Sequence, residues 1–318
     1  MSREIVSGTY RTRAFAALAL VMVLWAGNSI VARAVRLDIP PLTLAALRWW
    51  GALSLLGPFA WRPVRRDWQT LLAAWKPVLL LGLLGIGAFN ALLYSGLQYT
   101  TAANALLLQA GIPALVILVD RLLFGTRGSA LQVAGTLASI LGVLVIVFRG
   151  DSQALLDLRL GTGDILILIA VIVWAFYTVL LRTRPSVSPV SFIAVTFAVG
   201  ALVMTPFALW ELSSGRTINW NWGTAAAIGY VAVLPSTLSY FIYNWAAQAI
   251  GPARAGQAIT MMPVFGALLS ALLLGEVLYS YHAAGMALIV LGIGLGALAL
   301  RYEQPGGARP AGRLGAER

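Results

Sequence analysis

The sequence contains ten apolar runs long enough to cross a membrane as helices, and this pattern limits the fold more than any other feature. About 20 helical residues cross the hydrocarbon core of a bilayer, which is about 30 Å thick. The composition agrees, because only 10% of the residues are charged and 60% are hydrophobic, whereas about a quarter of a typical soluble domain is charged. The sequence therefore predicts an all-α integral membrane protein. We expect ten transmembrane helices at approximately Ala14–Ala34, Pro41–Trp61, Pro77–Gln98, Ala102–Phe124, Ala130–Phe148, Asp164–Leu181, Pro189–Trp210, Trp222–Ala249, Pro252–Leu274 and Tyr279–Leu300.

The connections between these runs are too short to hold a soluble domain, so function is expected within the helices or at their mouths. The first run could be read as a secretory signal, but it exceeds the usual core of about 7–15 residues and has a counterpart later in the chain. We interpret residues 1–13 as a cytoplasmic N-terminus and residues 302–318, which are rich in Gly, Pro and Arg, as a disordered cytoplasmic tail.

The basic residues predict the orientation of the chain. Cytoplasmic loops retain an excess of Lys and Arg. Ten spans place both termini on the same side of the membrane. Of the 22 basic residues, 16 fall on that side, five fall on the other side, and Arg48 lies within a span. We therefore expect both termini in the cytoplasm. The net charge of +11 reflects these loop clusters, and nucleic acid is not an expected partner.

The chain repeats itself at a period near 150 residues. At an offset of 149, Trp25 aligns with Trp174 and Asn28 with Tyr177. At offsets of 148 and 150, further matches pair Pro41 with Pro189, Pro58 with Pro206, Gln98 with Gln248, Pro113 with Pro263, Gly125 with Gly275, Gly135 with Gly285 and Gly142 with Gly292. The predicted units are residues 14–148 and 164–301, joined by a periplasmic connection at 149–163.

Each unit contains five predicted spans, and an odd number places the second unit in the bilayer upside down relative to the first. Inverted repeats of this kind allow one chain to exchange two related conformations, each open to one side of the membrane. Duplication in a purely structural membrane protein is the alternative. The pattern favours a transporter with a central cavity between the two repeats.

The sequence resembles the EamA-type drug/metabolite transporter superfamily over nearly its whole length. The resemblance rests on the two five-helix units, the segment "LAALRWW" that holds Arg48, and "LLLGEVLYSYHAAGMALIVLGIGLG", in which Gly275-Glu276 precedes Gly285 and Gly292. The first unit departs from the pattern, because "LLFGTRG" places Thr126 where a glutamate is common. Within the superfamily the chain is most similar to YddG-type amino-acid exporters. The resemblance implies ten helices around a central cavity, location in a bacterial inner membrane, and export of amino acids or related metabolites.

Polar residues recur at helical spacing in both repeats. Asn90, Tyr94 and Gln98 lie on one face of the third span, and Tyr240, Asn244 and Gln248 repeat that spacing in the eighth. Polar faces of membrane helices look toward a cavity or another helix, so these amides either line the cavity or hydrogen-bond between helices. The predicted cavity residues are Trp25, Asn28, Arg48, Asn90, Tyr94, Gln98, Trp174, Tyr177, Tyr240, Tyr243, Asn244, Gln257 and Met262.

Three kinds of residue in this set have competing interpretations. Trp25 and Trp174 lie near mid-span, where they either pack or form cavity walls. Arg48 lies inside a span, where it could extend to the interface, bind backbone carbonyls or meet a substrate carboxylate. Pro113 and Pro263 occupy matched mid-span positions and are predicted hinges, because proline removes a helical hydrogen bond.

The sequence lacks the motifs of other functional classes. It has no Cys, one His, no G-x-S-x-G, no H-E-x-x-H and no P-loop, so we expect neither an enzyme, nor an ATP-driven pump, nor a cofactor or metal. None of its 11 carboxylates lies in the middle third of a predicted span, which favours facilitated diffusion over proton coupling. We also expect the protein to be a monomer. A proton-coupled multidrug or metabolite exporter and a lipid flippase remain the alternatives.

Overall fold

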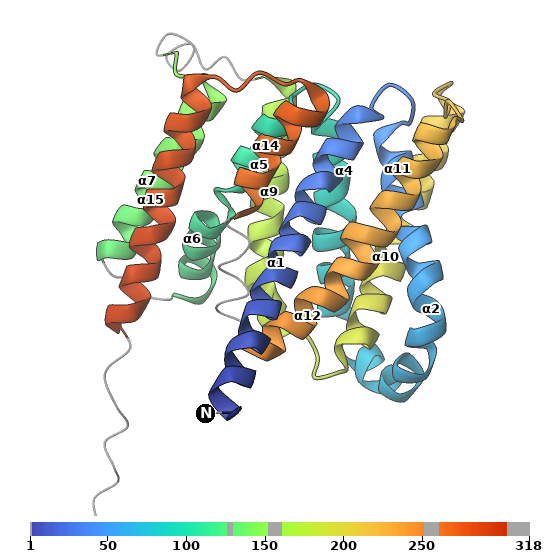
Figure 1. Ribbon diagram of the computed structural model, residues 1–318. Helices are drawn as coiled ribbons and strands as arrows, with labels where there is room; N and C mark the ends of the chain where they lie inside the picture. The colour runs from blue at the N-terminus through green and yellow to red at the C-terminus, as the bar shows by residue number, and fades with distance from the viewer. Residues whose placement is uncertain (1, 126–129, 152–160, 251–260, 304–318) are drawn as a thin grey trace, which may run out of the picture.

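The computed structural model describes residues 2–125, 130–151, 161–250 and 261–303, and these residues form a bundle of helices (Figure 1). The helices are α1 (Ser2–Ala34), α2 (Pro41–Ala73), α3 (Trp75–Leu81), η1 (Gly82–Ala88), α4 (Phe89–Gly96), α5 (Ala102–Gln109), α6 (Ile112–Phe124), α7 (Ala130–Val147), α9 (Thr162–Leu180), η2 (Leu181–Thr183), α10 (Pro189–Ser213), α11 (Trp222–Ala232), η3 (Val233–Leu238), α12 (Ser239–Ile250), α14 (Met262–Leu274) and α15 (Ser280–Glu303).

The structure confirms the all-helical membrane class. Five segments are long and apolar enough to cross a membrane: Arg13–Ala34, Trp75–Gly96, Thr162–Thr183, Pro189–Ser213 and Trp222–Tyr243. A sixth is added when Ala102–Gln109 and Ala114–Phe124, whose axes differ by 44°, are counted as one broken span. The remaining described helices do not meet the criteria of length and apolar character, so the count of ten stays a prediction. The helix α1 begins at Ser2, well before the predicted span.

Two long helices, α2 and α10, pack against each other and run antiparallel (right side of Figure 1). Near the end of α2, the Asp67 carboxylate accepts hydrogen bonds from Ser188 N and Ser191 Oγ at the start of α10 (2.9 and 2.8 Å). Near the end of α10, the buried Glu211 carboxylate accepts from Thr43 N and Oγ1 at the start of α2 (2.8 and 2.9 Å). Since α2 and α10 occupy matched places in the two repeats, each helix carries the N-terminal cap of its counterpart.

The helices α7 and α15 form a second antiparallel pair at the opposite end of the bundle (Figure 1). A Cβ added to Gly142 would lie 2.5 Å from the carbonyl oxygen of Gly285, and one added to Gly292 would lie 2.3 Å from that of Gly135. The absence of side chains thus lets the two backbones touch, as small residues do at membrane helix interfaces. Gly135 matches Gly285 and Gly142 matches Gly292, so the two contacts are exchanged by the symmetry of an inverted repeat.

Two π-helical segments interrupt the third and eighth predicted spans at matched positions. η1 joins α3 to α4, and η3 joins α11 to α12. A π turn widens the helix and leaves its backbone carbonyls free to bind side chains, and such turns are frequent at functional sites. In η3, Ser236 Oγ donates to Val231 O, five residues earlier (2.8 Å). Sequence periodicity predicted continuous helices here and did not predict either segment.

Candidate functional site: a cavity between the two repeats

A cavity of about 360 Å³ lies among helices of both repeats. Ligand pockets in proteins commonly measure about 300–1,000 Å³, so this cavity lies toward the lower end of that range. Most of the predicted residues line it: Trp25, Asn28, Arg48, Asn90, Trp174, Tyr177, Tyr240, Tyr243 and Met262.

Aromatic rings form much of the cavity wall. The ring centroid of Trp25 lies 5.5 Å from that of Tyr243 and 6.1 Å from that of Tyr240. On the other side, Trp174 lies 4.6 Å from Phe89 and 4.9 Å from Tyr177. These are normal aromatic pair separations. Each repeat therefore contributes a tryptophan from its first helix. Trp25 contacts two rings of the opposite repeat, and Trp174 contacts one, Phe89.

The Trp25 indole also connects the wall to a π-helical segment. Its Nε1 donates a hydrogen bond to the carbonyl oxygen of Pro235 in η3 (2.9 Å). The π turn leaves this carbonyl able to accept from a side chain. The Trp25 ring is thus held in place from both its apolar and its polar side.

Arg48 lies at the polar part of the cavity and is buried, with 6% of its surface exposed. Its Nε donates to Ser236 Oγ (2.7 Å). Its Nη1 lies within hydrogen-bond distance of Asn28 Oδ1, Asn90 Oδ1 and Tyr94 OH (3.0, 2.8 and 2.9 Å). We call these five residues the Arg48 cluster. Its members come from α1, α2, α4 and η3, so a single guanidinium connects four elements and both repeats.

The neighbours of Arg48 are held in turn by further hydrogen bonds. Tyr94 OH donates to Asn28 Oδ1 (2.7 Å), and Asn90 Nδ2 donates to the carbonyl oxygen of Ile86 in η1 (3.1 Å). The guanidinium also lies over the Trp49 ring, 4.4 Å from the centroid, which favours a cation. Two of the interpretations from sequence, that Arg48 extends to the membrane interface or binds backbone carbonyls, are therefore wrong. Polar side chains from other helices supply its acceptors.

The two halves of the cavity differ in chemistry despite the repeat. The offsets that relate the repeats place Tyr177 opposite Asn28, Thr196 opposite Arg48 and Tyr240 opposite Asn90. Thr196 Oγ1 donates to carbonyl oxygens of its own helix. The first repeat thus provides the buried arginine and the amides, and the second provides phenol rings at the positions that match Asn28 and Asn90.

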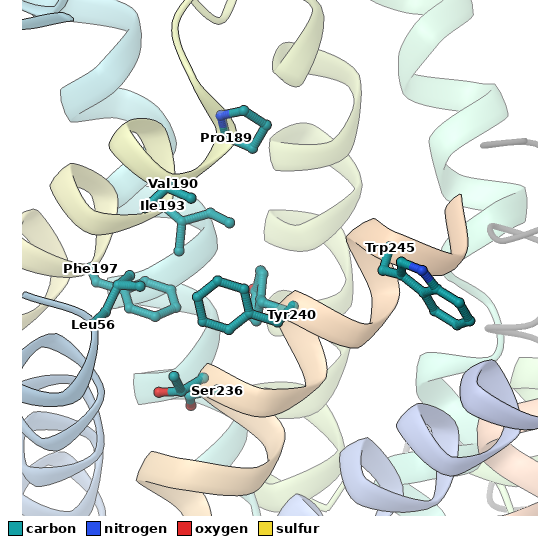
Figure 2. Close-up of a pocket in the computed structure, with 10 residues that line it drawn as sticks. Leu56, Pro189, Val190, Ile193, Phe197, Ser236, Tyr240 and Trp245 are labelled. Atoms are coloured by element: carbon teal, nitrogen blue, oxygen red, sulfur yellow. The ribbon is translucent and has the colours of Figure 1, made fainter. Parts of the chain in front are cut away.

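A second, more apolar pocket of about 310 Å³ lies between α2, α10 and the η3–α12 region (Figure 2). Figure 2 shows Tyr240 beside Phe197 and above Ser236, with Trp245 further along α12. Tyr240, Ile193 and Pro189 line both this pocket and the central cavity. The two spaces therefore share a wall.

Some predicted residues do not line the central cavity. Tyr94 lies behind Arg48 and is 1% exposed. Gln98 lies just beyond α4, where its backbone oxygen accepts from Arg33 (3.1 Å). Pro113 lies in the first turn of α6, beyond the 44° bend, and Pro263 in the first turn of α14; their role as hinges stays a prediction. The Asn244 side chain and the whole of Gln257 lie outside the described residues.

The carboxylates near helix ends have structural partners. Glu276 accepts from Ala102 N and Ala103 N (both 2.9 Å), so it caps α5 from the opposite repeat. Asp164 accepts from Thr100 Oγ1 (2.6 Å), and Asp120 pairs with Arg182. None of these three acids lines the cavity. The glutamate of the Gly275-Glu276 pair thus caps the N-terminus of α5.

Sequence reasoning missed several cavity residues. Trp49, Phe89, Gln109 and Arg184 all line the space. Trp49 follows Arg48 directly, and Phe89 precedes Asn90, so both could have been inferred as neighbours of predicted residues. Gln109 lies beside the break between α5 and α6, and its isolated polarity in an apolar run was the available signal. Arg184 was counted only as a loop charge.

These observations define a class: helical membrane proteins built from two inverted units with a cavity between them. The EamA-like transporter family model matches residues 12–148 and 161–297. The chain belongs to this family. It is 28% identical over 282 residues to an uncharacterized transporter of Archaeoglobus fulgidus, covering 87% of this chain and 94% of that one.

Other relatives and one solved structure agree. The uncharacterized transporter YyaM of Bacillus subtilis is 27% identical over 216 residues, covering 68% of this chain and 70% of that one. A WAT1-related protein of Arabidopsis thaliana is 26% identical over 316 residues, covering 89% and 83%. A crystal structure that is 20% identical superimposes with a TM-score of 0.60, covering 92% of this chain and 99% of that one. The solved structure supports the fold alone.

Proposed function

We propose that this protein exports amino acids, aromatic and neutral ones in particular, and related metabolites across a bacterial inner membrane by alternating access. In this proposal ten spans form two inverted five-helix repeats, with both termini in the cytoplasm. The observation that carries the proposal is the aromatic and amide-lined cavity between helices of both repeats. The antiparallel pairs α2/α10 and α7/α15 support it, because alternating access by an inverted repeat exchanges two open states related by a pseudo-two-fold axis.

The proposed energy source is the gradient of the substrate itself. A proton-coupled carrier commonly places a titratable Asp, Glu or His within its alternating site. The 11 carboxylates of this chain lie toward the ends of the predicted spans or in loops, and Glu276, Asp164 and Asp120 bind other parts of the protein. The proposal is therefore facilitated diffusion.

Transport by purified protein in liposomes tests this proposal. Vesicles loaded with unlabelled phenylalanine should accumulate labelled phenylalanine by counterflow with no ion gradient, and an imposed pH gradient alone should drive no accumulation. Empty liposomes and liposomes with Trp25→Ala protein serve as controls. Accumulation of substrate above equilibrium driven by a proton gradient would contradict the uniport mechanism and favour the proton-coupled alternative.

The apolar pocket next to the cavity favours a second candidate, movement of lipids. Its rim residues Phe241 and Trp245 are exposed, and an acyl chain could lie in such a groove while a headgroup occupies the cavity. A fluorescent-lipid assay in the same liposomes separates the two functions. Scrambling of labelled phospholipid without amino-acid counterflow would show that the protein moves lipids and would contradict the export proposal.

A further inference from the structure

The free groups of the Arg48 cluster are hydrogen-bond donors. Arg48 uses Nε and Nη1 within the cluster, and in the described part of the chain its Nη2 donates to no other group. A guanidinium has donors only, so it fixes the Asn28 amide with Oδ1 toward the arginine. Asn28 Nδ2 likewise has no partner among the described residues. Both side chains line the cavity, and neither nitrogen is fully buried without a partner, so both nitrogens reach the cavity space.

A third donor lies beside them. Trp49 Nε1 is the one fully buried side-chain nitrogen or oxygen that lacks a hydrogen-bond partner in the described residues. Trp49 is 1% exposed, lines the cavity, and lies under the Arg48 guanidinium. A buried donor without a partner is unfavourable. Donors from α1 and α2 therefore gather at one end of the cavity.

The charges around the cavity have one sign. Of the described residues that line it, Arg48 and Arg184 are charged and none is acidic. In the part of the chain that the structure describes, no carboxylate lies within 4.0 Å of the Arg48 guanidinium. A buried cation surrounded by neutral dipoles keeps its full charge and attracts an anion.

We propose that the Arg48 cluster binds the carboxylate of an aromatic substrate, with Arg48 Nη2 and Asn28 Nδ2 as donors, and that the amino group of an amino acid is not recognised by charge. The aromatic ring of the substrate lies against the tryptophan and tyrosine wall. This inference rests on the proposed function and narrows it, because the preferred class becomes aromatic monocarboxylates, with or without an amino group.

Three probes that share one ring separate these requirements: L-phenylalanine, 3-phenylpropanoate, which lacks the amino group, and phenethylamine, which lacks the carboxylate. Binding to the detergent-solubilised full chain can be measured from ligand-induced thermal stabilisation, which grows with ligand concentration over Kd. We expect phenylalanine and 3-phenylpropanoate to bind within a few-fold of each other. Phenethylamine should bind at least about tenfold more weakly, since it offers no anion to the cation.

Variants at two positions of the same helix assign the effect. Arg48→Gln should weaken binding of both carboxylates about tenfold or more and leave the weak binding of phenethylamine unchanged. Arg48→Lys keeps the charge and should retain part of the affinity. The matched control Arg65→Gln removes an exposed charge from α2 outside the cavity and should bind like the wild type. The probe comparison on the wild-type protein needs no variant, so a misfolded Arg48→Gln leaves the inference testable.

The outcomes separate this inference from the proposed function. If phenethylamine binds as tightly as phenylalanine, or if Arg48→Gln binds 3-phenylpropanoate like the wild type, carboxylate recognition is wrong even where counterflow of amino acids occurs. If the carboxylates bind as expected but no probe shows counterflow, the site stands and the export function is wrong. If none of the probes binds, both the carboxylate site and the proposed export of aromatic amino acids are wrong.

Discussion

Arg48 shows how a membrane protein can hold a charge in its interior without an acid. Moving an isolated ion into a low-dielectric medium is costly, yet here the acceptors are two amide oxygens, a phenol and a serine hydroxyl from three other elements. Hydrogen bonds to a charged group are stronger than those between neutral groups. Asn28 can lie within an apolar run because its side-chain carbonyl oxygen accepts a hydrogen bond from Arg48.

Two serines in neighbouring turns allow the strength of this arrangement to be measured. Ser236 and Ser239 are both fully buried, and each donates to the carbonyl oxygen five residues earlier. Only Ser236 also accepts from Arg48. Ser236→Ala should lower the free energy of unfolding by about 1.5–3 kcal/mol, the range for a hydrogen bond to a charged group, and Ser239→Ala by about 0.5–1.5 kcal/mol. Denaturant unfolding in detergent micelles compares them, and equal losses would mean that the Arg48–Ser236 bond adds no stability.

For individual residues, the sequence predicted which polar side chains belong to the cavity region better than it predicted which groups they contact. Arg48, Asn28 and Asn90 stood out because polar groups are rare inside apolar runs. Their mutual contacts could not be read from periodicity, because Ser236 is 188 positions from Arg48 and lies in a π turn. Trp49 could not be identified as a cavity residue from the sequence, because tryptophan is common in membrane spans. Its distinguishing feature, an indole N–H without a hydrogen-bond partner in the described residues, is seen only in the structure.

Among the helices, the exchange of caps between α2 and α10 was the least predictable feature. Asp67 and Glu211 appear in the sequence as acids near span ends, and nothing local relates them to helices that start far away in the chain. The helix boundaries, by contrast, follow from apolar length and proline, and most predicted spans coincide with described helices. The break between α5 and α6 lies just before Pro113, where proline was expected to interrupt the helix.

The Asp67 cap predicts a dependence of stability on pH. Asp67 lies beyond the apolar part of α2, and the Arg66 guanidinium, followed by Ser188 N and Ser191 Oγ, holds the pKa of its carboxyl well below the ordinary value of 3.8. A lowered pKa in the folded state gives stability that is fully present above the ordinary pKa and is lost as the pH falls toward the folded value.

Thermal unfolding in detergent between pH 6 and pH 3 tests this dependence. The wild type should lose stability relative to Asp67→Asn as the pH falls below 3.8, because the variant has no carboxylate to protonate. Other acids are common to both proteins and cancel in the difference. Parallel curves for the two proteins would show that the cap does not contribute to stability.

For the whole molecule, the repeat was the most informative signal. Matched tryptophans, prolines and glycines predicted two units, and the EamA-like transporter family model matches the chain twice, over 12–148 and 161–297. Their opposite orientation agrees with the antiparallel pairs α2/α10 and α7/α15. The division of the cavity into a charged and a phenolic half needed the structure, because the sequence does not say which side of each helix faces inward.

The distribution of basic residues gives the prediction for the molecule as a whole. Because the chain has no Cys, single cysteines can be introduced without background. A cysteine at Arg65 or Arg313 should resist a membrane-impermeant thiol reagent in intact cells, and one at Ser152 or Ser214 should react. Permeabilised cells control for buried sites. The reverse pattern would contradict the orientation and, with it, export as the direction.

The glycine contacts between α7 and α15 are self-complementary: two copies of a single five-helix unit, inserted in opposite directions, could make both of them. Such a pair of identical chains would carry two arginines in its cavity, one from each copy. Their repulsion would have to be compensated by a second anion, or the cavity would be less stable. Joining the units in one polypeptide removes that constraint, since Thr196 can replace the second arginine. A cavity with one buried arginine, Arg48, is thus a property that two identical units could not have.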